Sequence, residues 1–205
     1  MYLITNRHLC DENHYLSVIE EAINSGVKNI ILREKDMSDE KLTNLYNKIV
    51  RKTSYSHDKF NLIINSNINL YKKLNFSGIH LPFETFVQLV KERFIFEDNK
   101  ILGLSLHNTK EISILEKIIK ENNIKVDYIT LSHIYETKCK ENLKPKGINL
   151  LKEGKKITNI KIVALGGILP TNIEEVLKYA DDFAIMSVLF TCENVELKIK
   201  EYKCY

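Results

Sequence analysis

Short apolar segments rich in β-branched residues recur along the chain, and amphipathic stretches with helical spacing lie between them. Eight apolar segments are predicted to be strands, at residues 1–5, 27–32, 60–64, 78–81, 100–106, 126–131, 161–165 and 182–187. The clearest amphipathic stretch is 109–121, and the chain closes on a predicted helix at 195–202. This alternation predicts parallel strands joined by crossover helices.

The number of strand–helix units separates two fold classes. Eight units with nearly apolar strands predict an α/β fold of the closed (β/α)8 type, the TIM barrel, whereas an open doubly wound sheet usually has fewer strands. No GxGxxG motif follows the first predicted strand, and no GxxxxGK[ST] loop occurs in the sequence. With 205 residues, we expect one TIM-barrel domain over residues 1–205 that is close to the minimal length for the fold.

Composition narrows the class of protein. The chain is 44% hydrophobic and 28% charged, as globular proteins are, so a disordered chain is excluded. It has no run of about 18 uncharged apolar residues, and its first residues lack the layout of a signal peptide. We therefore expect a cytoplasmic protein that does not bind a membrane.

Charge and cysteine content argue against nucleic-acid binding, a zinc site and a disulfide framework. The net charge is only +3, and Lys alternates with Glu over 111–125, which is typical of solvated helix faces. Nucleic-acid binding is therefore not expected. The four cysteines are scattered without a CxxC pair, so neither a zinc site nor a disulfide framework is predicted.

The active site of a TIM barrel lies at the carboxyl ends of its strands. The candidate site residues are those at or just beyond the carboxyl ends of the predicted strands, most of them polar, cationic or glycine. They are Arg33, Lys35, Asn65, Ser105, His133, Thr137, Lys140, Gly166, Gly167, Met186 and Ser187.

Two of these strand ends predict a phosphate site. Gly166 and Gly167 follow the seventh strand, and Met186 and Ser187 end the eighth, which is the usual position for phosphate in this fold. Glycine lets backbone N–H groups approach an anion closely, and a helix N-terminus adds a favourable dipole. The alternative is a plain strand-to-helix turn.

Arg33 and the histidines each have a functional and a structural interpretation. The Arg33 guanidinium could grip a phosphate or carboxylate with two N–H groups, or it could form a surface ion pair with Glu34 or Asp36. His133 lies at a strand end and has the pKa range for proton transfer at neutral pH. His80 and His107 are expected to form hydrogen bonds within the barrel rim.

Eight segments of the chain, in order, resemble the thiamine phosphate synthase/TenI superfamily. They are ILREK (31–35), LIINSN (62–67), SGIHLP (77–82), LGLSLH (102–107), HIYETKCK (133–140), KGINLL (146–151), VALGGILPTNI (163–173) and DDFAIMSVLF (181–190). The resemblance covers essentially the whole chain and implies the TIM-barrel fold.

The resemblance also shows where this chain departs from the synthases. Synthases typically carry Gln-x-Arg-x-Lys after the second strand, Asn-Asp after the third, and an acid beyond the Gly-x-His segment. Their two acids hold Mg²⁺ on the pyrimidine pyrophosphate. Here these positions are Ile31, Asn65-Ser66 and Thr85, so both expected metal ligands are missing. Neither a metal nor another cofactor is therefore expected.

The histidine followed by Glu-Thr-x-Cys-Lys is similar to the TenI-type thiazole tautomerases, which are isomerases. The resemblance implies that a proton leaves the ring carbon bearing the carboxylate and returns at the exocyclic carbon of a thiazole phosphate. His133 would be the general acid/base, and Ser105 would bind or polarise the substrate. Arg33, Lys35, Asn65, Thr137 and Lys140 would bind the substrate, with its phosphate on Gly166, Gly167, Met186 and Ser187.

Two alternatives to the tautomerase stay open. A divergent thiamine phosphate synthase, a transferase, is favoured by the retained Arg33, Lys35, Ser105, Thr137, Lys140 and Gly167. The other alternative is a non-catalytic barrel with a binding or regulatory role. The expected partner is a small-molecule thiazole phosphate, and a homodimer is the expected state if the chain associates.

Overall fold

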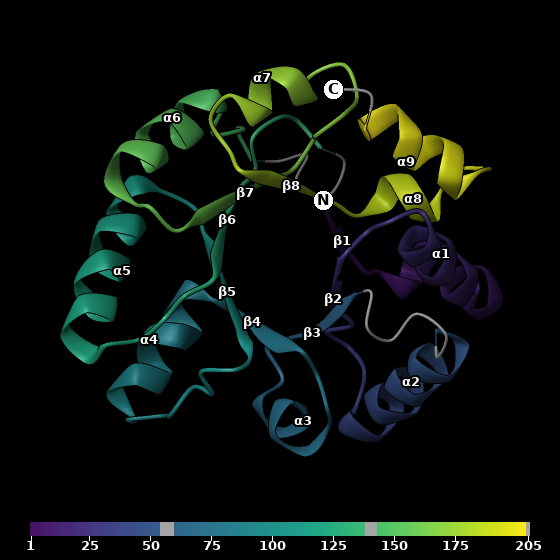
Figure 1. Ribbon diagram of the computed structural model, residues 1–205, viewed down its shortest axis with the longest axis horizontal. Helices are drawn as coiled ribbons and strands as arrows, with labels where there is room; N and C mark the ends of the chain where they lie inside the picture. Colours follow the sequence, from purple (N-terminus) through teal and green to yellow (C-terminus); the bar gives the residue numbers. More distant parts are fainter. Residues whose placement is uncertain (54–59, 138–142, 204–205) are drawn as a thin grey trace. The chain divides into compact units, whose positions relative to one another are not determined.

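The computed structural model describes residues 1–53, 60–137 and 143–203, in which strands and helices alternate along the chain (Figure 1). The strands are β1 Tyr2–Ile4, β2 Asn29–Leu32, β3 Asn61–Asn65, β4 Gly78–Pro82, β5 Ile101–Leu106, β6 Tyr128–Ser132, β7 Lys161–Leu165 and β8 Asp182–Ile185. They form a closed barrel in sequence order, β1 to β8. The predicted (β/α)8 barrel is confirmed.

Helices follow the strands, as the amphipathic stretches predict. They are η1 Arg7–Leu9, α1 Glu12–Asn24, α2 Asp39–Lys52, α3 Ile68–Lys73, α4 Phe83–Lys91, α5 Thr109–Asn122, α6 Ile148–Ile157, α7 Ile173–Leu177, α8 Ser187–Phe190 and α9 Val195–Lys203. Ser38 is the N-cap of α2, and its side chain accepts a hydrogen bond from the Lys41 N–H group at 3.4 Å. None of the helices in the described ranges is long and apolar enough to cross a membrane.

The chain divides into two compact units, and the first comprises Met1–Gly78 and Ile185–Tyr205. In it, β1, β2 and β3 pair in parallel, with Leu3 opposite Ile30 and Ile30 opposite Leu62. Helix α1 packs against α2, α8 and α9. Its buried residues recur at helical spacing, so one apolar face supplies the core of this unit.

The second unit comprises Ile79–Ala184. Strands β5, β6 and β7 pair in parallel there, with Ser105 opposite Thr130 and Thr130 opposite Val163. Helices α5 and α6 pack against each other. The expectation of a single domain over the whole chain stays a prediction.

The structure differs from the predicted elements most clearly after β8. The apolar segment 182–187 is predicted as one strand, but β8 ends at Ile185 and Ser187 begins the short helix α8. A short apolar run has no periodicity that separates a strand from a buried helix. The helix is therefore visible only in the structure.

Candidate active site

A buried carboxylate lies between the two cations that follow β2. Glu34 is 5% exposed and accepts hydrogen bonds from the Thr5 hydroxyl at 2.6 Å, the Tyr15 hydroxyl at 2.9 Å and the Arg7 N–H group at 3.0 Å. These donors replace the water that a carboxylate loses on burial. Burial, and then the charge of Glu34, raises the pKa of Tyr15 well above its usual value, so its hydroxyl stays a donor.

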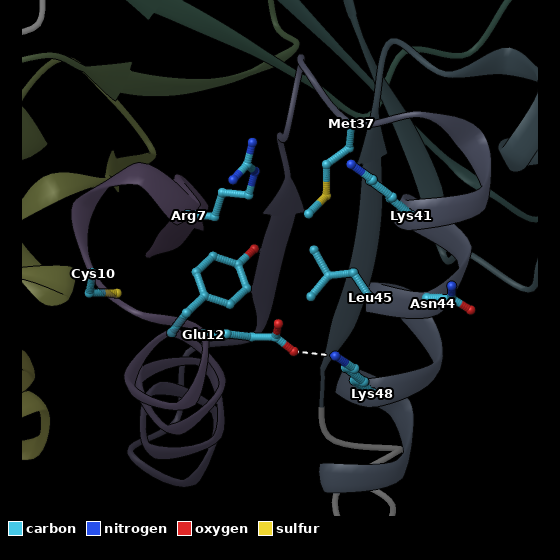
Figure 2. A pocket seen from close by; sticks show the side chains of 9 residues that line it. Arg7, Cys10, Glu12, Met37, Lys41, Asn44, Leu45 and Lys48 are labelled. Atoms are coloured by element: carbon cyan, nitrogen blue, oxygen red, sulfur yellow. Dashed lines mark hydrogen bonds and ion pairs between the residues drawn. The ribbon is translucent and has the colours of Figure 1, made fainter.

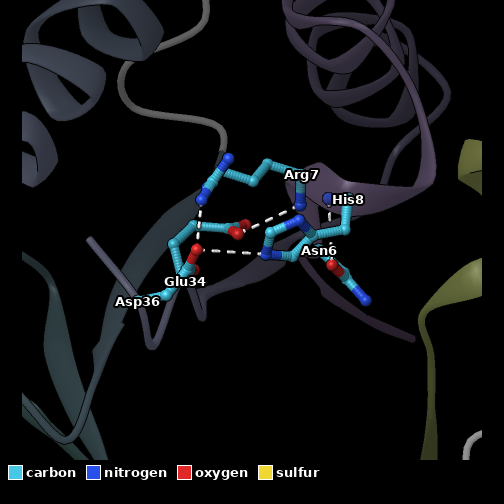
Figure 3. Close-up of polar contacts among 5 residues, drawn as sticks. All are labelled: Asn6, Arg7, His8, Glu34 and Asp36. Atoms are coloured by element: carbon cyan, nitrogen blue, oxygen red, sulfur yellow. Dashed lines mark hydrogen bonds and ion pairs between the residues drawn. The ribbon is translucent and has the colours of Figure 1, made fainter.

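The neighbouring carboxylate, Asp36, is exposed and paired differently (Figure 3). It contacts the Arg7 guanidinium, and an oxygen lies 3.2 Å from His8 Nε2. The alternative ion pair of Arg33 with Glu34 or Asp36 is therefore wrong, because both carboxylates bind other residues. Within the described part of the chain, the side chains of Arg33 and Lys35 form neither an ion pair nor a hydrogen bond.

A cleft of about 570 Å³ opens beside Lys35, between the ends of β2 and β3. Its wall contains Lys35, Asn65, Ser66, Asp39 and Asn67 among others. The structure thus brings together Lys35 and Asn65, two residues predicted to bind substrate. The Asn65 amide donates to Ser66 Oγ at 3.0 Å, which holds it at the end of β3.

The described ends of β3 and β4 do not fit the magnesium site that the resemblance implies for synthases. Asn65 ends β3 and Ser66 follows it, and Thr85 occupies the later acidic position, so no carboxylate stands at either place. Asp39, in the cleft wall, accepts a hydrogen bond from the Asn67 amide at 2.7 Å, and Glu34 is held by three donors. Two carboxylates directed at one ion are not formed at these positions.

A second cavity, of about 380 Å³, lies between α1 and α2 in the same unit (Figure 2). Its wall includes Cys10, Glu12, Lys48 and Met37, and Met37 also borders the first cleft. Lys48 and Glu12 form an ion pair across it. Burial, followed by the charges of nearby carboxylates, raises the pKa of the Cys10 thiol, so this sulfur is a weak nucleophile at neutral pH.

In the second unit, Ser105 belongs to a buried hydrogen-bonded group. Ser105 Oγ lies 2.7 Å from His80 Nε2, and His80 Nδ1 lies 3.0 Å from the Tyr128 hydroxyl. The two rings stack with centroids 5.5 Å apart. The sequence predicts Ser105 as a site residue and His80 as a hydrogen-bonding residue of the rim. These contacts confirm that His80 is hydrogen-bonded, but it is 4% exposed and lies in the middle of β4.

Tyr128 is the member of this group that sequence reasoning missed. Its ring occupies the space beside Gly103, where an added Cβ would lie only 2.1 Å from the Tyr128 Cζ atom. A glycine followed by Leu-Ser in β5, opposite a tyrosine in β6, is the signal that could have identified it.

We expect Gly103→Ala to lower the free energy of unfolding by about 2 kcal/mol, because the tyrosine ring is held by His80 and must move. Gly154→Ala, in α6, is the matched control. There the added Cβ meets terminal methyl groups of Leu131 and Ile112, at 2.9 and 3.2 Å, which can shift. Urea unfolding of both variants measures the difference, and equal stability of the two would contradict the packing argument.

His133 and His107 lie in different surroundings. His133 is buried, with 3% of its surface exposed. Its Nε2 atom lies 3.1 Å from the Leu143 carbonyl oxygen, and because a carbonyl can only accept, Nε2 must carry the proton and donate. His107 is exposed, and its Nδ1 atom lies 3.2 Å from both the carbonyl and the hydroxyl oxygen of Ser132, as expected for a rim residue. Thr137 is half-buried, and Lys140 lies outside the described residues.

The glycine pair after β7 has a backbone that other residues adopt only with strain. Gly166 and Gly167 have φ angles of 99° and 68°. An added Cβ on Gly166 would lie 2.4 Å from His133 Cβ, and one on Gly167 would lie 2.4 Å from the Glu136 carbonyl oxygen. The pair therefore lets the loop after β6 pack against the end of β7.

The other two predicted phosphate residues lie in the first unit, where Met186 precedes α8 and Ser187 is its first residue. Both are half-buried. Phosphate binding by the glycine pair and by these two residues stays a prediction.

Comparison with known proteins supplies the family. A family model described as thiamine monophosphate synthase matches residues 1–189. The chain is 30% identical to a thiamine-phosphate synthase of Clostridium tetani, over 98% of this chain and 92% of that protein. It is 32% identical to one of Persephonella marina, over 99% and 93%. A thiamine phosphate pyrophosphorylase of Pyrococcus furiosus has the same fold, with a TM-score of 0.77 and 22% identity over 98% of this chain and 92% of that one.

The expected thiazole tautomerase, and with it the isomerase class, is wrong. Relatives at about 30% identity over nearly the full chain are named thiamine-phosphate synthase, which favours the transferase alternative. The error has a physical reason. The absence of acids at Ser66 and Thr85 means that the expected magnesium ligands are missing, but it does not indicate which other reaction the protein would catalyse. The general acid/base role of His133 belonged to the tautomerase and is withdrawn with it.

Proposed function

Because the chain belongs to the thiamine monophosphate synthase family, we propose that it is a transferase that forms thiamine phosphate. It would join a pyrimidine pyrophosphate to a thiazole phosphate and release pyrophosphate. The observation that carries this proposal is the likeness to synthases along almost the entire chain, rather than at one motif. Both substrates are small anions, and we propose that the reaction takes place in the cytoplasm.

The residues after β2 support the binding of an anion. Arg33 and Lys35 are two cations whose side chains have no anionic partner in the described part of the chain. Glu34, between them, is fixed by its three donors, and the Arg33 N–H group donates to the Thr5 hydroxyl at 3.0 Å. The backbone that carries both cations is therefore held firmly. We assign the substrate's pyrophosphate to Arg33 and Lys35.

Other predicted residues keep their roles as proposals. Asn65 shares the cleft with Lys35, and its amide offers a donor and an acceptor for the substrate. Ser105, Thr137 and Lys140 are proposed substrate contacts on the resemblance alone. The described residues do not fit the two-acid magnesium site, and the roles proposed for these side chains do not depend on that ion.

The substitution Arg33→Ala is expected to raise the KM for the pyrimidine pyrophosphate about 30-fold, since hydrogen bonds to charged groups each contribute about 2 kcal/mol. Arg33→Lys keeps the charge but loses the two-pronged geometry, so we expect an intermediate value. Arg51→Ala removes an exposed cation from the last turn of α2 and is the matched control. An unchanged KM in Arg33→Ala would contradict the assignment.

The proposed function is tested by incubating the purified protein with both substrates and measuring thiamine phosphate by chromatography. The reaction is run with Mg²⁺ and with EDTA, so that the metal requirement is measured rather than assumed. Thiamine phosphate that forms only when both substrates are present supports the proposal. No product under either condition would overturn it.

A further inference from the structure

We propose that His80 is a positioning residue that holds the Ser105 hydroxyl toward the substrate, with Tyr128 fixing the His80 ring. This inference rests on the proposed function, because it concerns the substrate of that reaction. Its basis is the chain of two contacts, Ser105 Oγ to His80 Nε2 at 2.7 Å and His80 Nδ1 to the Tyr128 hydroxyl at 3.0 Å.

The three residues of this group differ in how accessible they are to a substrate. His80 is 4% exposed and Tyr128 is 1% exposed, whereas Ser105 is half-buried near the carboxyl end of β5. Of the three polar groups, the serine hydroxyl is the one that a substrate can reach. The histidine and tyrosine are therefore placed to act on bound substrate through Ser105.

The chemistry of the imidazole explains why the contact orients the hydroxyl. In neutral histidine one ring nitrogen is a donor and the other an acceptor. If Nε2 carries the proton, it donates to Ser105 Oγ and leaves the serine proton for the substrate. If Nδ1 carries it, the serine donates to Nε2 and offers its lone pairs outward. Either way, the ring selects one hydroxyl orientation, and the contact with Tyr128 keeps the ring in place.

Ring stacking and the small residue beside it hold this arrangement. The His80 and Tyr128 rings are nearly parallel, at 15°, and Gly103 leaves room for the tyrosine. A purely structural role for the group, in which it only stabilises the barrel interior, is the competing explanation. The two explanations differ in whether His80 matters once the serine hydroxyl is gone.

The test compares two conservative replacements of His80 in the full-length protein. The glutamine amide reaches about as far as Nε2 and can contact Ser105, whereas the asparagine amide reaches about as far as Nδ1 and cannot. We expect His80→Gln to keep kcat within about 3-fold of the wild type. His80→Asn should lower kcat about 30-fold, a loss typical of one misplaced active-site contact.

The decisive measurement is a double-mutant cycle with Ser105→Ala. If His80 acts through Ser105, His80→Asn lowers kcat by less than about 2-fold when the serine is already alanine. His14→Asn, in the first turn of α1, is the control and should leave kcat unchanged. Circular dichroism and thermal unfolding of each variant establish that the proteins compared are folded.

Each outcome decides the question. A 30-fold loss from His80→Asn in both backgrounds would overturn the positioning role and leave the proposed function intact. Equal activity of the Gln and Asn variants in the presence of Ser105 would overturn it as well. A folded wild-type protein that forms no thiamine phosphate would overturn the proposed function, and this inference with it.

Discussion

Replacing Glu34 by alanine is expected to lower the free energy of unfolding by about 4 kcal/mol, because three donors lose their acceptor and each unsatisfied buried group costs about 1–3 kcal/mol. The donors are the hydroxyls of Thr5 and Tyr15 and the Arg7 N–H group. Tyr15 is 1% exposed, so water cannot readily replace the lost contact. Chemical denaturation followed by circular dichroism measures the change.

Asp36→Ala is the matched control, since it removes a carboxylate two residues away. Asp36 is exposed and pairs with Arg7 and His8 at the surface, where an ion pair contributes about 1 kcal/mol or less. We expect a change in that range. Equal losses in Glu34→Ala and Asp36→Ala would contradict the claim that the buried carboxylate organises the end of β2.

The second large effect is expected at Gly167, where alanine should lower the free energy of unfolding by about 3 kcal/mol. The φ angle is 68°, and a Cβ would lie 2.4 Å from the Glu136 carbonyl oxygen and 2.9 Å from the Tyr135 carbonyl carbon. These are backbone atoms, which cannot move away as a side chain can. The loop after β6 would have to shift.

Gly147→Ala separates the two causes of this loss. Gly147 has a similar φ angle of 72°, but no atom of the described residues lies within 4 Å of the position of an added Cβ. Its ψ angle of 173° places it in a backbone region that is almost exclusive to glycine, so its substitution should cost about 2 kcal/mol from backbone conformation alone. If Gly167→Ala costs no more than Gly147→Ala, the close approach of the two loops does not constrain the protein.

Much of the fold could be predicted from the sequence because the signals are local. Apolar β-branched runs predict the strands, helical spacing predicts the helices, and Ser38 followed by two acids predicts the start of α2. Helix α8 could not be predicted, because the four residues Ser187–Phe190 continue an apolar run and show no period. The number and order of units were enough to identify the barrel.

The site could be predicted only in part, because its contacts join residues far apart in the sequence. Lys35 and Asn65 share a cleft, as strand ends of a parallel sheet should. The burial of Glu34 depends on hydrogen bonds from Thr5 and Tyr15, and the sequence around Glu34 contains no pattern that predicts it. The contact of Tyr128 with His80 likewise depends on which side chains face each other across strands.

The tautomerase prediction is wrong because it rests on a few positions of the chain. Ser66 and Thr85 stand where synthases carry acids, and the loop from His133 to Lys140 is similar to that of the tautomerases. Chain-long likeness to thiamine-phosphate synthases is the broader observation. We propose that the pyrophosphate is bound by Arg33 and Lys35, the two cations that synthases also carry after the second strand.

The most direct test of this account follows both products of the proposed reaction in one tube. Purified protein is mixed with the pyrimidine pyrophosphate and the thiazole phosphate, and phosphorus NMR monitors thiamine phosphate and free pyrophosphate over time. We predict that the two products form in equal amounts, and more slowly with Arg33→Ala at low substrate concentration. Consumption of neither substrate by the folded wild-type protein would contradict the assignment of this chain as a thiamine-phosphate synthase.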